Sequence, residues 1–356
     1  MFRIAFVLCL VATSARADWV RSTPEAEGLS AARLRDMEGD VRAGEFKKIT
    51  SIAIARKGKL VYEAYFDGDA TTLRDTRSVG KTITSILVGM AIAERKLSAV
   101  DAKILAILPE RARRIANPDP RKLKITVEDF LTMSGPLECD DWNDFSRGNE
   151  ERMYLVEDWT QFILDLPIRG WAREGTSEES PEYGRRFSYC TGGVFVLGEV
   201  LGRVTNSAVD RYAQERLFAP LGITRAQWVY SPRGQAMTGG SLRLATRDLL
   251  RIAQLYLDDG VHDGKQLVDS AWIKRSLEPK VRIDEATEYG YLWWLKAFGP
   301  KKIPAFWMSG NGGNKVMGFP SLDLTVVITS TNYATRGMHE QTEKLVVEYI
   351  LPAVLR

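Results

Sequence analysis

Sequence typical of β-strands occurs near both ends of the chain, and a long stretch of helical sequence separates the two regions. Residues 48–66 form two strand patterns around the turn Arg56-Lys57-Gly58-Lys59, which is typical of a hairpin. Further strands are predicted after residue 285, at Tyr289–Phe298, Ala305–Ser309, Lys315–Phe319 and Leu324–Ser330. We therefore expect an α/β (α+β) fold, in which one antiparallel sheet built from both termini is flanked by helices and carries an inserted all-α domain.

The length of the chain, 356 residues, allows one large domain or two interlocked parts. We assign residues from about 18 to 100 and 281 to 356 to the α/β part, and about 101 to 280 to the helical part. Helices are predicted over residues 24–44 and 335–355, and at Leu123–Met133, Trp159–Asp165, Val194–Val204 and Thr246–Leu257. A surface loop is predicted over residues 170–186, which are rich in Gly, Ser, Glu and Pro.

One segment, Ser78–Arg95, is apolar on nearly every side until its end. A helix of that kind is buried, because it has no polar face to turn toward water. Gly80 and Gly89 within the segment would let neighbouring backbone approach closely.

The first residues have the pattern of a secretory signal. Arg3 supplies a positive charge, Ile4–Ala12 is a short apolar run, and Ala15-Arg16-Ala17 offers small residues for cleavage. We expect residues 1–17 to be removed after Ala17, and a secreted or periplasmic protein that begins at Asp18. A lipid anchor at Cys9 is the weaker alternative, because Leu8 precedes it. No other run is apolar for eighteen residues, so we expect no membrane span.

Charge and cysteine content bear on partners and compartment. The 49 basic and 46 acidic residues nearly balance, and no basic stripe is present, so we expect no nucleic-acid partner. After removal of the signal, Cys139 and Cys190 remain. In an oxidising compartment they form either a disulfide or two separate buried thiols, and the sequence leaves both open.

Several hydrolase chemistries lack the residues they need. The chain has two histidines, His262 in a turn and His339 in a helical segment, and no Gly-x-Ser-x-Gly motif. A Ser-His-Asp triad is therefore disfavoured. The chain also has no His-Glu-x-x-His, phosphate loop or dinucleotide fingerprint, so we expect no metal and no cofactor.

The pattern Ser78-Val79-Gly80-Lys81 begins the buried segment. Residues three apart share a helix face, so Lys81 can reach the Ser78 hydroxyl. Burial disfavours the charged form of a lysine and makes Lys81 a candidate base. Ser78 lies in the first turn, where free N–H groups favour a developing oxyanion. The structural alternative is a capping serine followed by a lysine that reaches solvent.

Two later motifs add candidate partners. Tyr189 lies in Phe187–Gly193, just before an apolar helix, and its phenol could relay protons or could simply pack. Met308–Gly313 ends one predicted strand and turns toward the next, so it is either an edge close to a ligand or a glycine-rich hairpin turn.

Together and in this order, the three motifs resemble the serine β-lactamase and penicillin-binding superfamily. The resemblance is to the class C-like branch that includes 6-aminohexanoate-dimer hydrolases, esterases and D-aminopeptidases, and it covers roughly residues 25 to 350. Supporting stretches are Asp129–Gly135, Gly239–Arg243, Thr246–Leu249, Gly260–Leu267 and Tyr289–Tyr291.

The resemblance implies roles for individual residues. Ser78 matches the nucleophile, Lys81 its base, and Tyr189 the tyrosine of a Tyr-x-Asn motif. The backbone N–H groups of Ser78 and Asn311 would form the oxyanion hole. Substrate-binding positions are implied for Ser309, Gly310 and Thr191.

Two departures from the family pattern qualify the implied activity. Thr191 stands where β-lactamases and peptidases carry Asn, and Met308 stands where they carry Lys or His. The lysine normally helps to bind the β-lactam carboxylate, so its absence from position 308 argues against strong β-lactamase activity.

We therefore predict an exported serine hydrolase that acts on a small-molecule amide or ester through an acyl-enzyme. The alternatives are a β-lactamase or D,D-peptidase, and a non-catalytic sensor or binding protein. The sequence predicts neither the substrate nor the oligomeric state. Several residues are predicted to lie near the cleft, where surface packing is the favoured role: Trp142, Trp171, Tyr183, Arg185 and Arg186.

Overall fold

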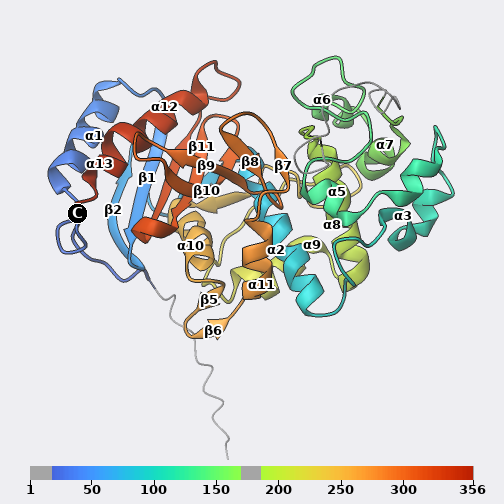
Figure 1. The fold of residues 1–356 in the computed structure, drawn as a ribbon, viewed down its shortest axis with the longest axis horizontal. Coiled ribbons are helices and arrows are strands. Elements are labelled where there is room, and N and C mark those ends of the chain that lie inside the picture. Colours follow the sequence, from blue (N-terminus) through green and yellow to red (C-terminus); the bar gives the residue numbers. More distant parts are fainter. Residues whose placement is uncertain (1–17, 170–185, 356) are drawn as a thin grey trace, which may run out of the picture.

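The computed structural model describes residues 18–169 and 186–355 (Figure 1). The predicted signal segment, residues 1–17, lies outside the described residues, and so does the predicted loop at 170–186 except for Arg186.

An eight-stranded antiparallel sheet is the frame of the fold, with the strand order β2-β1-β12-β11-β10-β9-β8-β7. β1 pairs with β12, with Ile52 opposite Ile328, so the two ends of the chain close one sheet as predicted. The strands are β1 (Ile49–Arg56), β2 (Lys59–Tyr65), β7 (Val281–Arg282), β8 (Thr287–Tyr289), β9 (Trp294–Phe298), β10 (Ile303–Gly310), β11 (Asn314–Phe319) and β12 (Leu324–Ser330).

The predicted strand Tyr289–Phe298 is in fact two strands, because β8 ends at Tyr289 and β9 begins at Trp294. Leu292 between them has a left-handed backbone with φ of 60°. Its N–H donates to the carbonyl of Leu131, 2.8 Å away in the helical part. This long-range contact turns the chain at a point where the local sequence still has a strand pattern.

Helices cover both faces of the sheet (Figure 1). α1 (Ala31–Ala43), η5 (Leu345–Ile350) and α13 (Leu351–Ala353) come from the two chain ends and share one apolar cluster with the sheet. α12 (Met338–Lys344) precedes η5 and contacts β11. α10 (Thr246–Leu257) packs against β1, β11 and β12, although its residues fall in the range that we assigned to the helical part. Along β1, Ile52 and Ile54 belong to this apolar cluster, whereas Ala53 and Ala55 belong to a second apolar cluster. The split follows from the alternation of side chains between the two faces of a strand.

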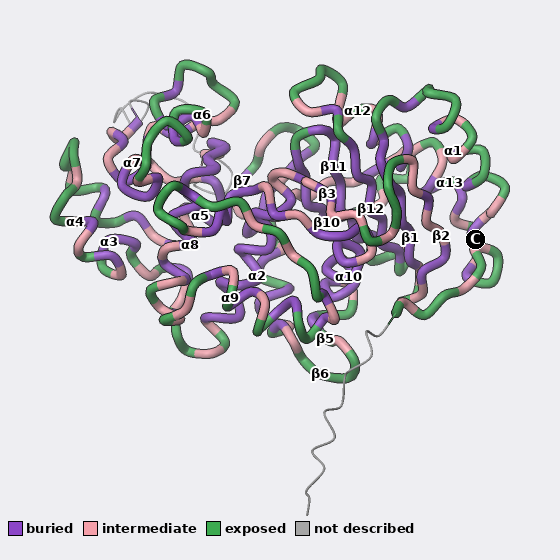
Figure 2. The backbone as a smooth tube through the Cα atoms, turned by 180° about the vertical axis from the view of Figure 1, so that it is seen from behind, coloured by how far each residue is buried: buried purple, intermediate pink, exposed green. Residues whose placement is uncertain are grey.

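The nucleophile helix α2 (Gly80–Ala93) follows the short turn η1 (Arg77–Val79), and every residue from Gly80 to Ala91 is buried. This confirms the expectation of a buried helix. A side chain at Gly89 would overlap the ring of Trp272, so the close approach expected there is present. Figure 2 shows the buried chain concentrated in the sheet and in the helices beside it.

The helical part packs against α2 through α8 (Thr191–Thr205). The predicted helix Leu123–Met133 is divided into η2 (Pro120–Lys124) and α5 (Val127–Leu131). Thr126 and Asp129 cap each other's backbone N–H groups at 2.8 and 3.2 Å, which starts a new helix at Val127. The other helices here are α3 (Ile104–Ile107), α4 (Pro109–Ala112), α6 (Glu150–Met153), α7 (Trp159–Asp165), α9 (Val209–Ala213) and η3 (Gln214–Phe218).

Smaller elements join the two parts. They are β3 (Leu73–Asp75) paired with β4 (Arg243–Ala245), β5 (Val261–His262) paired with β6 (Lys265–Gln266), α11 (Ser270–Ser276) and η4 (Pro320–Leu322).

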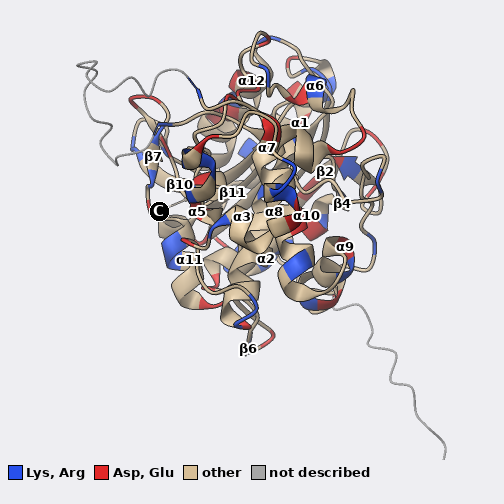
Figure 3. Ribbon diagram, turned by 90° about the vertical axis from the view of Figure 1, so that its right-hand side faces the viewer, with Lys and Arg blue, Asp and Glu red and all other residues tan. Residues whose placement is uncertain are grey.

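Basic and acidic residues are interspersed along the chain in Figure 3. Across residues 18–169 and 186–355, no helix is both long and apolar enough to cross a membrane.

Candidate active site

Ser78 lies in the turn η1, directly before α2, and Lys81 follows it one helical turn later. The Nζ atom of Lys81 is 2.8 Å from the Oγ atom of Ser78 and 2.5 Å from the carbonyl oxygen of Gly239. Lys81 is only 2% exposed. The structure therefore fixes the lysine beside the serine and out of solvent, rather than letting it reach the surface.

The backbone before Ser78 is held in an uncommon conformation. Arg77 has a left-handed backbone with φ of 53°, which is costly for a residue with a side chain. Its guanidinium lies 4.4 Å from the ring centroid of Tyr333, and its carbonyl accepts an N–H from Ser241 at 3.1 Å. These contacts hold the turn that presents Ser78 at the end of α2.

The loop containing Gly239 and Gly240 is a part of the site to which the sequence analysis gave no role. Gly239 supplies the carbonyl that accepts from Lys81. A side chain at Gly240 would come within 3.4 Å of the Arg77 carbonyl oxygen, so the loop lies against the turn of the nucleophile. The signal available in the sequence was the pair of glycines, which permits such an approach.

Tyr189 reaches the site from the residues just before α8. Its ring centroid lies 4.9 Å from Nζ of Lys81, and Trp142 stacks on it at 5.4 Å with an interplanar angle of 8°. The structure thus brings Tyr189 together with Ser78 and Lys81. Trp142 lines the cavity as well, in addition to packing on Tyr189.

A disulfide joins Cys139 to Cys190, with Cα atoms 5.4 Å apart. Of the two alternatives left open by the sequence, the bridge is the one that the structure contains. It ties the residue after Tyr189 to the segment that carries Asp141 and Trp142. The Tyr189 carbonyl also accepts the N–H of Asp141 at 2.8 Å.

Asp141 organises the same corner of the site. Its carboxylate accepts the backbone N–H groups of Thr191 at 2.7 Å and Glu150 at 2.9 Å. Burial raises the pKa of the Asp141 carboxyl to about 6, the charge of Glu150 acts in the same direction, and Lys81 opposes both. Thr191 is 1% exposed and lies outside the set of residues that line the cavity.

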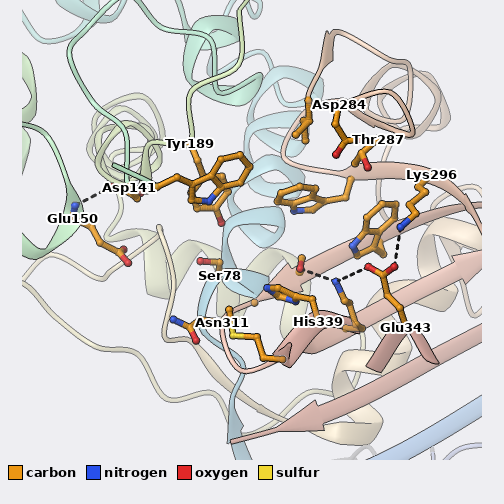
Figure 4. A pocket seen from close by; sticks show the side chains of 18 residues that line it. Ser78, Asp141, Glu150, Tyr189, Asp284, Thr287, Lys296, Asn311, His339 and Glu343 are labelled. Atoms are coloured by element: carbon orange, nitrogen blue, oxygen red, sulfur yellow. Dashed lines mark hydrogen bonds and ion pairs between the residues drawn. The ribbon is translucent and has the colours of Figure 1, made fainter. Parts of the chain in front are cut away.

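Gly310 and Asn311 bring the end of β10 against the nucleophile. A side chain at Gly310 would overlap the carbonyl oxygen of Thr76 and come within 3.3 Å of the Ser78 nitrogen. The Asn311 side chain accepts the N–H of Ala334 at 2.8 Å, so it holds the turn. Figure 4 places Asn311 beside Ser78, as an oxyanion role for its backbone N–H would need.

Ser309 lies one residue earlier on β10, and its hydroxyl accepts from Nζ of Lys315 at 3.1 Å. Lys315 belongs to β11 and is 3% exposed. Burial lowers the pKa of its ammonium to about 8, although Glu343 opposes this shift. The sequence analysis treated Lys315 as an ordinary strand residue. The signal available in the sequence was a charge at the start of a predicted strand whose other residues, 316–319, carry no polar side chain.

The cavity formed by these residues has a volume of about 650 Å³ (Figure 4). Ser78, Tyr189, Ser309, Gly310 and Asn311 all line it, which brings together five of the predicted site residues. Its other lining residues are Asp141, Trp142, Glu150, Ile283, Asp284, Thr287, Trp294, Lys296, Trp307, Lys315, Met338, His339 and Glu343. Arg186 does not line it, and Trp171, Tyr183 and Arg185 lie outside the described residues.

Comparisons with known proteins agree on the fold and the family. The beta-lactamase family model matches residues 47–349. The 6-aminohexanoate-dimer hydrolase of Paenarthrobacter ureafaciens is 24% identical over 303 residues, which are 81% of this chain and 70% of that protein.

Two solved structures show the same fold. A penicillin-binding protein homologue from Caulobacter crescentus superposes with a TM-score of 0.66 at 18% identity, covering 94% of this chain and 100% of that one. A class C β-lactamase from Rhodobacter sphaeroides gives a TM-score of 0.62 at 14% identity, covering 90% of this chain and 100% of that one.

Proposed function

The chain belongs to the beta-lactamase family of serine hydrolases, and we propose that it cleaves an amide or ester bond through an acyl-enzyme on Ser78. The observation that carries this proposal is the 2.8 Å contact between the Ser78 hydroxyl and the buried amine of Lys81. Ser78 lines a cavity of about 650 Å³, which is large enough for a small-molecule substrate.

The first step is attack by Ser78 on the substrate carbonyl carbon. A neutral lysine amine has two N–H groups and one lone pair, so Lys81 can donate to the Gly239 carbonyl while its lone pair takes the Ser78 proton. The serine oxygen then forms a bond to carbon, and the carbonyl electron pair becomes an oxyanion. In this proposal the backbone N–H groups of Ser78 and Asn311 donate to it. Ser78 lies at the start of the helical segment, where the first N–H groups have no partner within the helix, and Asn311 follows Gly310, whose backbone lies against the Ser78 nitrogen.

The second step breaks the bond to the leaving group. As the carbonyl re-forms, the leaving nitrogen or oxygen departs with the bonding electrons and needs a proton. Tyr189 supplies it from its phenol and is recharged from Lys81, whose amine lies 4.9 Å from the ring centroid. Water then attacks the acyl-enzyme with the same groups in reversed roles, which releases the acid and restores Ser78.

An amide or ester is the substrate class that the site favours. Trp142, Trp294 and Trp307 give the cavity broad apolar surfaces around the nucleophile. The curated relative acts, by its name, on 6-aminohexanoate dimers. Met308 is buried and does not line the cavity, so it takes no part in substrate recognition there.

The experiment that tests this function compares wild type with Ser78→Ala and with Ser98→Ala, a matched control at an exposed serine. The substrates are p-nitrophenyl butyrate, a short linear amide and nitrocefin. We expect hydrolysis of the ester or the amide by wild type and by the control, and loss of that turnover by at least a thousandfold in Ser78→Ala. Full turnover by Ser78→Ala would refute the proposal, and rapid turnover of nitrocefin alone would favour the β-lactamase alternative.

The proposal also includes export of the protein, with removal of residues 1–17. It is supported by the signal pattern over residues 1–17 and by the Cys139–Cys190 disulfide, since such bonds persist in oxidising compartments. Expression of the full chain in a bacterial host and N-terminal sequencing of the periplasmic fraction should give a start at Asp18. Retention of the intact N-terminus in the cytoplasm would contradict export.

A further inference from the structure

A buried lysine lines the cavity from the sheet side, and the proposed acylation mechanism does not use it. Lys315 points from β11 into the wall formed by β10 and α12, and it lines the cavity although its side chain is 3% exposed. A buried ammonium is costly unless its donors find acceptors. Its neighbours therefore indicate what the site can bind.

The hydrogen-bond partners of Lys315 leave donor capacity unused. An ammonium group has three donors. The one hydrogen bond that the described residues provide goes to the Ser309 hydroxyl at 3.1 Å. Glu343 lies 3.8 Å away, beyond hydrogen-bond distance, and already accepts from Lys296 at 2.8 Å.

The ion pairs at this end of the cavity hold Lys315 loosely. Lys296 and Lys315 both pair with Glu343, at 2.8 and 3.8 Å, as the dashed contacts in Figure 4 show, and Glu340 of α12 adds a second negative charge near Lys315. Asp284 also lines the cavity, but Figure 4 draws it across the opening, above Thr287, and it accepts the backbone N–H of Ala286 at 2.8 Å. The carboxylate paired with Lys315 therefore stays 3.8 Å away, and an anion at hydrogen-bond distance would compensate the buried charge more fully.

His339 adds an unpaired polar atom at the same place. Burial, and then the charge of Lys315, lower the pKa of the His339 imidazole to about 3, so the ring is neutral at physiological pH. Its Nδ1 atom is buried and has no hydrogen-bond partner among the described residues. In the tautomer protonated at Nδ1, this nitrogen is a donor that no described residue satisfies.

The distance from the nucleophile is short. Ser309 directly precedes Gly310, whose backbone packs against the Ser78 turn. Ser309 and Ser78 line the same cavity, so a group bound at the Ser309 hydroxyl lies in the cavity where Ser78 attacks the carbonyl. A group bound there belongs to the same small substrate.

We propose that Lys315, with Ser309 and His339, forms a subsite that binds an anionic group of the substrate, a carboxylate, close to the scissile bond. The proposal rests on the proposed hydrolase function, which it deepens by naming a substrate class: amides or esters that also carry a negative charge. Glu343 positions Lys315 through their ion pair and, being itself negative, is not the binding group.

The test measures selectivity between esters of similar length. The neutral ester is phenyl pentanoate, and the anionic probes are phenyl hydrogen glutarate, charged on the acyl side, and 3-carboxyphenyl pentanoate, charged on the leaving group. The readout is the ratio of kcat/KM for each anionic ester to that for the neutral ester. Lys315→Met removes the charge at similar length, and Lys301→Met removes an exposed lysine as the matched control.

We expect wild type to prefer one of the anionic probes, and Lys315→Met to lower that ratio about tenfold or more, as expected for loss of a charge-assisted hydrogen bond. The preference should be expressed mainly in KM, and Lys301→Met should keep it. No preference in wild type, or a Lys315→Met variant that keeps the wild-type ratio, would overturn the subsite.

A second readout separates this idea from the hydrolase function. In the Ser78→Ala background, binding of phenyl hydrogen glutarate, 3-carboxyphenyl pentanoate and phenyl pentanoate is followed by fluorescence of the cavity tryptophans. Tighter binding of one of the anionic esters, weakened by Lys315→Met, would support the subsite even if wild type hydrolysed none of them. Hydrolysis of the esters with equal binding of all three would overturn the subsite alone.

If Lys315→Met fails to fold, the pH dependence of the anionic-to-neutral kcat/KM ratio of wild type still tests the proposal. The charged groups that face Lys315 are Glu343 and Glu340 from α12 and Lys296 from β9. Because the pKa of Lys315 is lowered to about 8, its positive charge is present below that pH and is lost above it. The anionic-to-neutral ratio should therefore fall as pH rises through about 8, whereas changes at Ser78 and its base cancel in the ratio. A constant ratio from about pH 7 to 9.5 would contradict the proposal.

Discussion

Removing the Cys139–Cys190 disulfide should destabilise the protein measurably. The perturbation is Cys139→Ala, which leaves the Cys190 sulfur in place to accept the N–H of Gly193 at 3.3 Å and so keeps the cap of α8. The two cysteines are 51 residues apart in sequence. Loss of a cross-link of that span costs about 4 kcal/mol in the loop-closure account of disulfide stability.

The assay is urea unfolding of wild type and Cys139→Ala, followed by tryptophan fluorescence. With a slope of about 3 kcal/mol per molar urea, a loss of about 4 kcal/mol lowers the midpoint by roughly 1 M. Wild type treated with a reductant should shift by a similar amount, which separates the bond from the side-chain change. A shift below about 0.3 M in both samples would refute the reasoning, because the closed loop would then contribute little.

Three further perturbations test the site and the fold. Gly310→Ala places a methyl group on the Thr76 carbonyl oxygen and should lower kcat/KM at least tenfold in a folded protein, whereas normal turnover would show that β10 does not have to abut the nucleophile. Trp142→Ala removes the ring that stacks on Tyr189 at 5.4 Å and should lower kcat/KM more than Trp142→Phe does. Equal kcat/KM values for the two variants would show that this stacking does not contribute to turnover. Gly39→Ala meets open space on α1 and should raise the free energy of unfolding by about 0.5 to 1 kcal/mol, without a change in turnover; a thermal melt and an ester assay check both.

The sheet and the nucleophile helix could be predicted because their signals are local. β12 and α7 have the predicted bounds, and the apolar segment after Ser78 is buried. The contact between Ser78 and Lys81 also follows from local geometry, since residues three apart on a helix face each other. These features need no knowledge of what the rest of the chain does.

The remainder depends on contacts between distant segments. The turn at Leu292 is set by an N–H bond to Leu131, and the disulfide by a Cα separation of 5.4 Å, and neither can be read from spacing. Lys315 was missed because a strand pattern alone does not show that one side chain turns toward a hydroxyl on the next strand. The absence of lysine at position 308 argued against strong β-lactamase activity, and β11 places a different lysine, Lys315, beside Ser309.

The central claim is that Ser78 becomes acylated, and the mass of the protein tests it most directly. Wild type, Ser78→Ala and Ser98→Ala are incubated with a fluorophosphonate probe and with p-nitrophenyl butyrate, and intact masses and peptide maps are recorded. The account predicts one adduct per chain, on the peptide containing Ser78, in wild type and Ser98→Ala, and none in Ser78→Ala. An adduct on another residue, or full ester turnover by Ser78→Ala without any adduct, would contradict it.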